Sequence, residues 1–599
     1  MRVADYIMQS LSAAGGKHVF LVTGGMIMHL TDALLQNQDQ SYICCHHEQS
    51  ATMAAEAYGR YTGQLGVALV TAGPGALNTL TGVVGAFVDS APCIVVAGQS
   101  KLEHARITGP RQFALQGFNN LPLFAQVTKY AVMLSDRAQI RFEVEKAIYM
   151  ATHGRPGPVY IECPIDVQAW DFDPEAYPGF DPALEAGCLD LKASRPTEVA
   201  ALVARLASAK RPCILAGAGV RSAGAIDLLH ECATQMNIPV MTSRLGMDLI
   251  GDDHPLFIGR PGTYGDRPAN FATQNCDLLL VIGCRLGMGL VGYADPKTFA
   301  PGAFKVGVDV DPNELSKPLV AFDETLLMDA AAFLQDAITA AASLAPAGSS
   351  WVEQIHQWRQ AYPVDLPEYA NETQGLNSYH FTRVFSEHLN SEAVVVLDTG
   401  SCFHVHAQAF KVKFGQRHII TGGLSTMGYC PASIGVAAAH QGRDVYCITG
   451  DGSVQFNIQE FETIAYNKLP VKTVIYNNGG YLLIRLTQLN FCDNRRMGES
   501  ASTGVGFPDM SKIAQAYGIH YIRIESEAVL TQRLEELITY KGPVICEVIN
   551  PPEQLLMPRV ASRKMDDGKM MSMPFDDMFP FLPREEYEAN CVAKTWDAS

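Results

Sequence analysis

Residues Gly450–Asn478, GDGSVQFNIQEFETIAYNKLPVKTVIYNN, decide the fold of this chain. The stretch opens with one acidic residue between two glycines and closes with two asparagines. The apolar run 444–449, DVYCIT, and the run 471–476, VKTVIY, each predict a buried strand. Segment 453–468 between them predicts a helix, because its apolar residues recur at helical spacing: Phe461, Ile464 and Ala465. The sequence therefore predicts a strand–helix–strand unit of an α/β fold.

Two polar side chains of this unit are expected to meet. A right-handed crossover makes the two strands parallel, so Asp451 and Asn478 emerge at the carboxyl ends of the strands, where open α/β sheets bind ligands. The glycines let the backbone approach a ligand, and a helix N-terminus favours phosphate. One carboxylate, one amide oxygen, a backbone carbonyl and phosphate oxygens suit an octahedral Mg²⁺ ion. The competing interpretation is a turn Asp and a turn Asn-Asn without a ligand.

Length and composition limit the class of protein. The chain has 599 residues, of which 48% are hydrophobic and 18% charged, and its net charge is −17. At roughly 100–200 residues per domain, the length predicts about three domains. The acidic balance argues against nucleic acid or an anionic membrane as the main partner. No apolar run reaches the ~18 residues of a transmembrane helix, so no membrane partner is expected.

The compartment is predicted from the cysteines and from the start of the chain. The 15 cysteines are spread singly apart from Cys44 and Cys45, and no CxxC pair occurs. This usage predicts reduced thiols in a cytoplasmic protein. The first residues, MRVADYIMQSLSAAGG, are not typical of a signal peptide.

Short apolar runs that end in Gly or Pro alternate with helix-length segments along the chain. This alternation predicts βαβ units and parallel sheets. We expect three doubly wound α/β domains, at residues 1–175, 192–345 and 370–550, followed by an ordered tail or lid at 551–599. The stretch 174–196 is rich in Pro, Gly and Asp and predicts a linker.

Segment 450–478 resembles the diphosphate-binding signature of thiamin diphosphate (ThDP) enzymes. The resemblance implies that the side chains of Asp451 and Asn478 and the backbone carbonyl of Gly480 hold Mg²⁺. It implies that Ser453 faces the diphosphate. Further cofactor contacts are implied for three residues: Gly452, Tyr481 and Leu482.

Segment 42–63, YICCHHEQSATMAAEAYGRYTG, resembles the part of the same family that carries the catalytic glutamate, here Glu48. The resemblance implies that residues 1–175 bind the pyrimidine of ThDP and that residues 370–550 bind its diphosphate. A carboxyl in an apolar pocket shares a proton with a pyrimidine nitrogen, which activates the cofactor. Without the resemblance, Glu48 is interpreted as a carboxylate at the start of a helix.

Two further segments resemble cofactor-contacting parts of the family. Segment 422–439, GGLSTMGYCPASIGVAAA, places Met427 under ThDP, where a bulky residue folds the cofactor into a V shape. The competing interpretation is a methionine that fills the core. Segment 398–403, DTGSCF, falls where relatives place more diphosphate contacts: Thr399, Gly400, Ser401 and Cys402.

The resemblance covers nearly the whole chain and is closest to the acetolactate synthase (acetohydroxyacid synthase) large-subunit group. The segments that carry it are 71–99, 154–168 and 507–519. Segments 261–286 and 306–315 resemble the part of that group that binds FAD, which implies FAD contacts from Gly217, Gly219, Arg285 and Asp309. The alternative is a central domain with a relict or empty nucleotide cleft.

The acceptor side departs from that group. Its members carry a tryptophan soon after the asparagine pair, where Thr487 falls here. The family's AFQE text appears as ALQG, so Gln116 matches and is expected to contact substrate, while the acidic residue is replaced by Gly117. An arginine expected shortly after Arg285 is also absent.

The resemblance implies decarboxylation of a 2-ketoacid, with pyruvate expected, followed by carboligation of the two-carbon unit to a carbonyl acceptor. The alternatives are transfer to a keto-sugar nucleotide or another ketone, a simple 2-ketoacid decarboxylase, and a non-catalytic interaction subunit. In this family the domains that carry Glu48 and Asp451 come from different subunits, which implies a homodimer or homotetramer. The acceptor and any regulatory subunit stay open.

Overall fold

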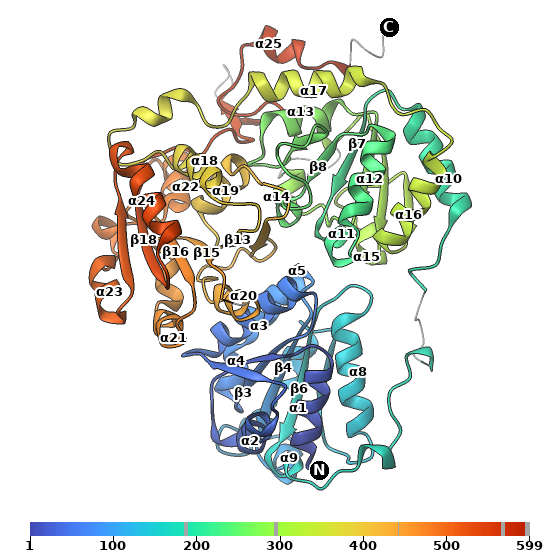
Figure 1. Cartoon of the computed structure of the whole chain (residues 1–599), viewed down its shortest axis with the longest axis vertical. Helices are drawn as coiled ribbons and strands as arrows, with labels where there is room; N and C mark the ends of the chain where they lie inside the picture. The colour runs from blue at the N-terminus through green and yellow to red at the C-terminus, as the bar shows by residue number, and fades with distance from the viewer. Residues whose placement is uncertain (185–189, 293–297, 441, 565–569, 594–599) are drawn as a thin grey trace.

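The computed structural model describes residues 1–184, 190–292, 298–440, 442–564 and 570–593 of the chain. Three six-stranded sheets with helices packed around them form three α/β domains (Figure 1). Every pairing between neighbouring strands within these sheets is parallel. The predicted fold class is therefore confirmed.

The first domain has the strand order β2-β1-β3-β4-β6-β5. Its strands are β1 (His18–Leu21), β2 (Ser41–Cys44), β3 (Gly66–Val70), β4 (Cys93–Gln99), β5 (Tyr130–Met133) and β6 (Pro158–Pro164). Its helices are α1 (Val3–Ala13), α2 (Met28–Gln36), α3 (Glu48–Thr62), α4 (Pro74–Asn78), α5 (Leu80–Asp89), α6 (Leu102–Ala105), α7 (Leu121–Ala125), α8 (Ile140–Thr152) and α9 (Ile165–Gln168). Strands β3 and β4 are buried at every residue, as expected for parallel strands covered on both faces.

The central domain has the order β12-β11-β10-β7-β8-β9, the arrangement of dinucleotide-binding sheets. Its strands are β7 (Pro212–Ala216), β8 (Val240–Thr242), β9 (Phe257–Gly259), β10 (Leu278–Ile282), β11 (Phe304–Asp309) and β12 (Glu324–Leu327). Its helices are α10 (Pro196–Ser208), α11 (Ala218–Ser222), α12 (Ile226–Met236), α13 (Arg267–Asn275), α14 (Met288–Val291), α15 (Pro312–Ser316), α16 (Ala330–Ala341) and α17 (Ser349–Ala361).

The third domain repeats the strand order of the first, as β14-β13-β15-β16-β18-β17. Its strands are β13 (Val394–Leu397), β14 (Arg417–Ile420), β15 (Val445–Gly450), β16 (Val471–Asn477), β17 (His520–Ile524) and β18 (Val544–Ile549). Its helices are α18 (Ser378–His388), α19 (Ser401–Ala409), α20 (Ala432–Ala439), α21 (Glu460–Tyr466), α22 (Leu482–Phe491), α23 (Met510–Tyr517) and α24 (Glu527–Thr539). Strands β15 and β16 lie side by side and parallel, as predicted.

The helix predicted over 453–468 is wrong in its first part. Residues Ser453–Asn457 form a 3-10 helix, and α21 begins only at Glu460. The side chain of Gln455 donates to the backbone carbonyl of Asp451 (2.9 Å), and that of Asn457 donates to the carbonyl of Gly428 (2.6 Å). Side-chain bonds of this kind compete with regular helical bonding. This segment is therefore tied to neighbouring loops.

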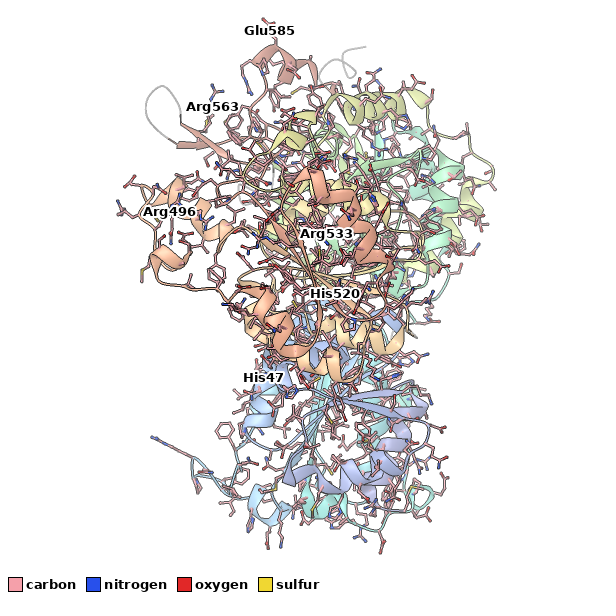
Figure 2. The ribbon with its side chains drawn as sticks, turned by 60° about the vertical axis from the view of Figure 1, so that its left-hand side comes forward. His47, Arg496, His520, Arg533, Arg563 and Glu585 are labelled. Carbon is pink, nitrogen blue, oxygen red and sulfur yellow. The ribbon has the colours of Figure 1, made fainter. Side chains whose placement is uncertain are left out.

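The C-terminal residues run from the third domain onto the central one. They contain β19 (Ser562–Lys564), β20 (Met570–Ser572) and α25 (Arg584–Ala589). Arg267 of α13 donates to the carbonyl of Met578 (3.1 Å), and Trp358 of α17 donates to Asn590 (2.7 Å). Figure 2 shows Glu585 of α25 at the end of the molecule opposite the first domain. The described part of this segment is thus an ordered tail on the central domain.

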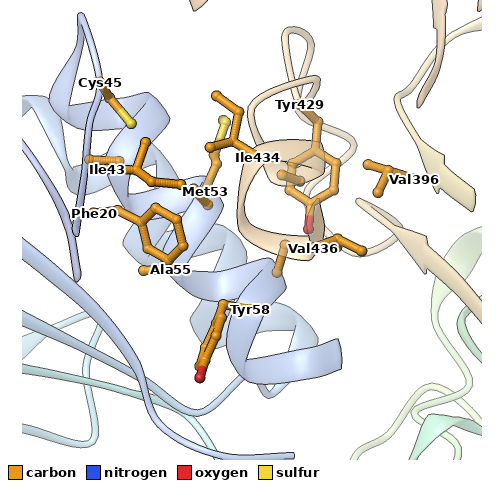
Figure 3. Close-up of a cluster of buried hydrophobic side chains, with 14 of the residues drawn as sticks. Phe20, Ile43, Cys45, Met53, Ala55, Tyr58, Val396, Tyr429, Ile434 and Val436 are labelled. Atoms are coloured by element: carbon orange, nitrogen blue, oxygen red, sulfur yellow. The ribbon is translucent and has the colours of Figure 1, made fainter. Parts of the chain in front are cut away.

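The first and third domains share one hydrophobic core across helices α3 and α20. Figure 3 shows the two helices side by side, with Met53 of α3 facing Ile434 of α20. The contact is close because Gly435 has no side chain: a Cβ there would lie 1.9 Å from the carbonyl oxygen of Ala54. None of the described helices is both long and apolar enough to span a membrane.

Replacing Gly435 with alanine is expected to destabilise this joint. The added methyl group has to push the α3 backbone away, and overpacking of this kind costs about 1–3 kcal/mol. The urea midpoint of unfolding should fall accordingly. Gly85→Ala in α5 is the matched control, because nothing lies within 4 Å of its Cβ position. An unchanged midpoint for Gly435→Ala would contradict the close packing.

Candidate functional site

Asp451 follows β15 at the carboxyl edge of the third sheet. The strand order reverses between β13 and β15, which is where open α/β sheets bind ligands. The carboxylate is only 4% exposed, and its two oxygens accept the backbone N–H groups of Gly452 and Gly480, both at 2.9 Å. Burial raises the pKa of Asp451 to about 7. A cation bound here would favour the charged carboxylate.

Asn478 directly follows β16, the strand next to β15. Its Nδ2 donates to the hydroxyl of Ser401 (3.5 Å), which begins α19. Its Oδ1 is buried and has no hydrogen-bond partner. An unpaired buried acceptor costs about 1–3 kcal/mol, so this oxygen points to a bound donor or cation.

Gly480 completes the group of expected metal ligands. Its φ is +151°, and a Cβ would lie 1.9 Å from the carbonyl oxygen of Glu499, so the loop requires glycine. A buried carboxylate, an unpaired amide oxygen and a loop carbonyl are the donors that Mg²⁺ prefers, and they fit a Mg²⁺–diphosphate group. The described residues contain no group of three or more His, Cys, Asp or Glu suited to a metal ion. A site here therefore relies on amide, carbonyl and ligand oxygens.

The loops around this group contain the other expected diphosphate contacts. Gly400 precedes α19 with φ +103°, and the Cys402 thiol is buried, which raises its pKa well above the usual range. Tyr481 lies so close to Gly452 that a Cβ on Gly452 would be 2.2 Å from its ring. Leu482 is buried at the start of α22. The structure thus brings the loops that follow β13, β15 and β16 together.

The hydroxyl of Ser453 is already engaged. It donates to Asp398 (2.7 Å) and accepts the backbone N–H of Gly428 (2.8 Å). Asp398 is fully buried and also accepts from Thr449 (2.9 Å) and from the backbone N–H of Thr399 (2.7 Å). Burial raises the pKa of Asp398. This carboxylate ties the loop after β13 to the loop after β15.

Sequence reasoning quoted Asp398 but gave it no role. The sequence carries a signal for it, because Asp398 directly follows a buried strand, as Asp451 does one strand further along the sheet. Met427 lies half-buried in the loop before α20, next to Gly428. Ser453 therefore links Asp398 to the loop that contains Met427, because its hydroxyl bonds to Asp398 and to the backbone N–H of Gly428.

Glu48 is the first residue of α3 and is half-buried. Its Oε2 accepts from Asn78 Nδ2 at 2.9 Å, a partner that the sequence did not indicate. The preceding residue, His47, caps the helix by accepting the N–H of Gln49 (3.1 Å), and it lies near the boundary between the first and third domains (Figure 2).

Two of the expected residues stand apart from the strand-end group. In the part of the chain that the structure describes, no hydrogen bond joins Glu48 or Gln116 to Asp451 or Asn478. Gln116 is exposed on the 106–120 loop with φ +58°. Within one chain, the described hydrogen bonds therefore do not join the two halves of the expected site.

A cleft of about 1300 Å³, a volume that includes its open mouth, lies at the central domain's reversal point. Gly219, Arg285 and Asp309 line it, as expected for a nucleotide site. Gly217 packs behind the residues that line the cleft, where a Cβ atom would be 2.1 Å from the carbonyl oxygen of Gly283. Other lining residues come from the first domain (Asp89, Ser90 and Arg155) and from the third (Phe403 and Gly422). All three domains thus form the cleft.

Comparison with known proteins agrees with this geometry. Three family models match the chain: the thiamine pyrophosphate (TPP) enzyme N-terminal TPP binding domain at residues 1–123, the central domain at 199–337, and the C-terminal TPP binding domain at 398–548. Thiamine pyrophosphate is ThDP under another name.

Full-length relatives agree with the models. The chain is 32% identical to a probable acetolactate synthase large subunit of Methanocaldococcus jannaschii and 31% identical to the acetolactate synthase large subunit of Porphyra purpurea, each over 93% of both chains. It is 28% identical to the acetolactate synthase large subunit of Lactococcus lactis, over 96% of both chains. The chain therefore belongs to the thiamine pyrophosphate enzyme family, in the group related to acetolactate synthase large subunits.

Proposed function

We propose that this protein is a ThDP- and Mg²⁺-dependent enzyme that decarboxylates pyruvate and joins the two-carbon unit to a carbonyl acceptor. The observation that carries the proposal is the buried pair at the reversal point of the third sheet. There the buried Asp451 carboxylate follows β15, and the unpaired Oδ1 of Asn478 follows the neighbouring strand β16. The relatives named acetolactate synthase support the same reaction.

The residues of this chain have distinct roles in that reaction. Bound ThDP supplies the electron sink for decarboxylation. Asp451, Asn478 and Gly480 would hold the metal through oxygen atoms and so fix the diphosphate. Glu48 would hold and return a proton at the cofactor's pyrimidine nitrogen through a carboxyl oxygen. Tyr481 and Leu482, at the start of α22, would add contacts to the bound cofactor.

Acetolactate formation, in which a second ketoacid is the acceptor, is the main candidate. Transfer to another ketone, such as a keto-sugar nucleotide, is the second. Two observations support this second candidate. Gly117 replaces the acidic residue of the family's AFQE motif, and Thr487 stands where a tryptophan is expected. Thr487 is exposed and its hydroxyl donates to the carbonyl of Leu483 (2.8 Å), so it offers no large side chain to shape an acceptor pocket.

One experiment tests the proposal. Purified protein is supplied with ThDP, Mg²⁺ and pyruvate, CO₂ release is followed, and products are identified by mass. Acetolactate as the main product supports the first candidate. CO₂ release that rises when a different ketone is added, with a ligated product, supports the second. Free aldehyde alone indicates a simple decarboxylase, and no CO₂ would exclude pyruvate as donor.

We also propose that the central cleft holds FAD. The strand order, the glycines at the ends of β7 and β10, and Asp309 at the end of β11 support a dinucleotide there. Asp309 lines the cleft, where its carboxylate would accept a hydrogen bond from a ribose hydroxyl. Flavin released by heat and quantified by fluorescence, relative to the protein concentration, tests the FAD proposal. Absence of flavin would contradict FAD binding but not the proposed ThDP reaction.

A homodimer or homotetramer and a cytoplasmic location complete the proposal. Apolar side chains stand exposed beside Gln116, at the end of α22 and beyond it: Leu115, Phe491 and Met497. Burying them against a second copy would remove apolar surface from water. No disulfide is recorded among the described residues, which suits a reducing compartment. Sedimentation velocity measures the assembly directly.

A further inference from the structure

A buried ion pair lies directly behind the loop that contains the expected metal ligands. Arg485 of α22 donates from Nε to Glu499 at 2.6 Å, and the two side chains are 3% and 1% exposed. Buried ion pairs are weak stabilisers, because desolvation offsets their attraction. A pair at this depth therefore calls for a role other than stability.

The remaining donors of Arg485 go to backbone carbonyls. Nη1 donates to the carbonyl of Asn478 (3.3 Å) and to that of Pro552, and Nη2 donates to the carbonyl of Gly479 (3.3 Å). Two of these carbonyls lie in the loop that contains Asn478 and Gly480. The planar guanidinium thus joins this loop to the first residues after β18.

Glu499 holds the same loop from its other end. Its backbone carbonyl accepts the N–H of Tyr481 (2.8 Å), and it is the atom that excludes any side chain at Gly480. Its carboxylate also accepts from the hydroxyl of Ser500 (2.8 Å). The Arg485 hydrogen bond counters the effect of burial and holds the pKa of Glu499 below its usual range.

The charge balance also favours a role toward a metal. A guanidinium this close to a Mg²⁺ site would repel the cation if it stood alone. Glu499 neutralises it, so the loop gains the directional hydrogen bonds of arginine without a net positive charge. A neighbouring pair, Arg496 with Glu553 (2.7 Å), is more exposed, and Figure 2 shows Arg496 on the outside of the domain.

We propose that Arg485 and Glu499 are positioning residues that hold loop 478–481 in the conformation that binds the Mg²⁺ of the cofactor. The proposal rests on the proposed function, because it assigns Mg²⁺ to Asn478 and Gly480. Neither residue touches the metal. Arg485 fixes the backbone at Asn478 and Gly479, and Glu499 fixes it at Tyr481.

The test measures metal binding without turnover. Free Mn²⁺ is followed by electron paramagnetic resonance during titration of the whole protein with ThDP present. The paired variant Arg485→Met/Glu499→Leu removes both charges together, so no unpaired charge is left buried. We expect its Mn²⁺ affinity to fall at least about tenfold, as for groups that support a metal site from behind its ligands.

A matched control separates positioning from general stability. Arg260 and Asp252 form another pair, 3% and 9% exposed, in the central domain. The variant Arg260→Met/Asp252→Leu should lower the unfolding temperature about as much as Arg485→Met/Glu499→Leu does. Its Mn²⁺ affinity should be unchanged. An equal loss of affinity in both paired variants, or no loss in Arg485→Met/Glu499→Leu, would overturn the positioning role.

A conservative variant keeps the proposal testable if the paired variant does not fold. Arg485→Lys retains the charge opposite Glu499 but cannot reach three carbonyls at once. We expect a loss of Mn²⁺ affinity smaller than in the paired variant but measurable; an unchanged affinity would overturn the proposal. Absence of ThDP-dependent Mn²⁺ binding in the unmodified protein would instead overturn the proposed function, and this role with it.

Discussion

Asp451→Asn is expected to weaken ThDP-dependent Mg²⁺ binding by more than about a hundredfold, which exceeds the loss typical for residues that only support a metal ligand. The change preserves shape but removes the charge that holds the cation. It also disturbs the loop, because both carboxylate oxygens accept backbone N–H groups, from Gly452 and Gly480. An asparagine has only one oxygen, so its amide group has to face one of these donors.

Isothermal titration of the protein with Mg²⁺ in the presence of ThDP measures this loss. Asp509→Asn is the matched control, because Asp509 caps α23 by accepting the N–H of Ser511 (2.9 Å) and asparagine caps equally well. The control should bind Mg²⁺ as the unmodified protein does. If Asp451→Asn retained full affinity, the assignment of the metal to the third sheet would be wrong.

Glu48→Gln is expected to slow the exchange of the C2 proton of bound ThDP by more than about a hundredfold, within the usual contribution of a positioned proton-transfer group. Glutamine can still accept the hydrogen bond from Asn78, but it cannot take or return a proton. Retention of ThDP and Mg²⁺ should be unchanged, because Asp451 and Asn478 belong to another domain. The reaction of pyruvate should slow in parallel.

Deuterium exchange followed by acid quench and NMR measures this rate. Glu103→Gln provides the control, because that side chain is exposed on α6 of the same domain. Exchange at the unmodified rate in Glu48→Gln would remove Glu48 from the mechanism. Loss of ThDP binding together with loss of exchange would indicate that the glutamate also positions the cofactor.

The repeated local pattern made much of the fold predictable. Apolar runs followed by Gly, Asp or Asn placed the strand ends correctly, as β15 and β16 with Asp451 and Asn478 show. The helix expected over 453–468 was wrong at its start, because the side chain of Gln455 bonds back to Asp451 and that of Asn457 bonds to the distant Gly428 loop. A long-range bond such as that of Asn457 leaves no periodic signal in the sequence.

The parts of the site that escaped prediction depend on distant partners. Arg485 and Glu499 read as ordinary charges of a helix and a loop, and only the fold buries them together. Asn78 is likewise a polar residue at the end of a short helix, and nothing in the sequence around it predicts its hydrogen bond to Glu48. The roles of Met427, Gln116 and Ser453 toward the cofactor stay predictions.

The core shared by α3 and α20 determines how this chain can be assembled during synthesis. Residues 48–62 leave the ribosome long before residues 432–439, with the whole central domain between them. Until then the face of α3 that meets α20 has no partner, although the first and central domains each have a buried cluster of their own and can fold as units. The first domain therefore keeps one apolar face open to chaperones until the third domain has been made.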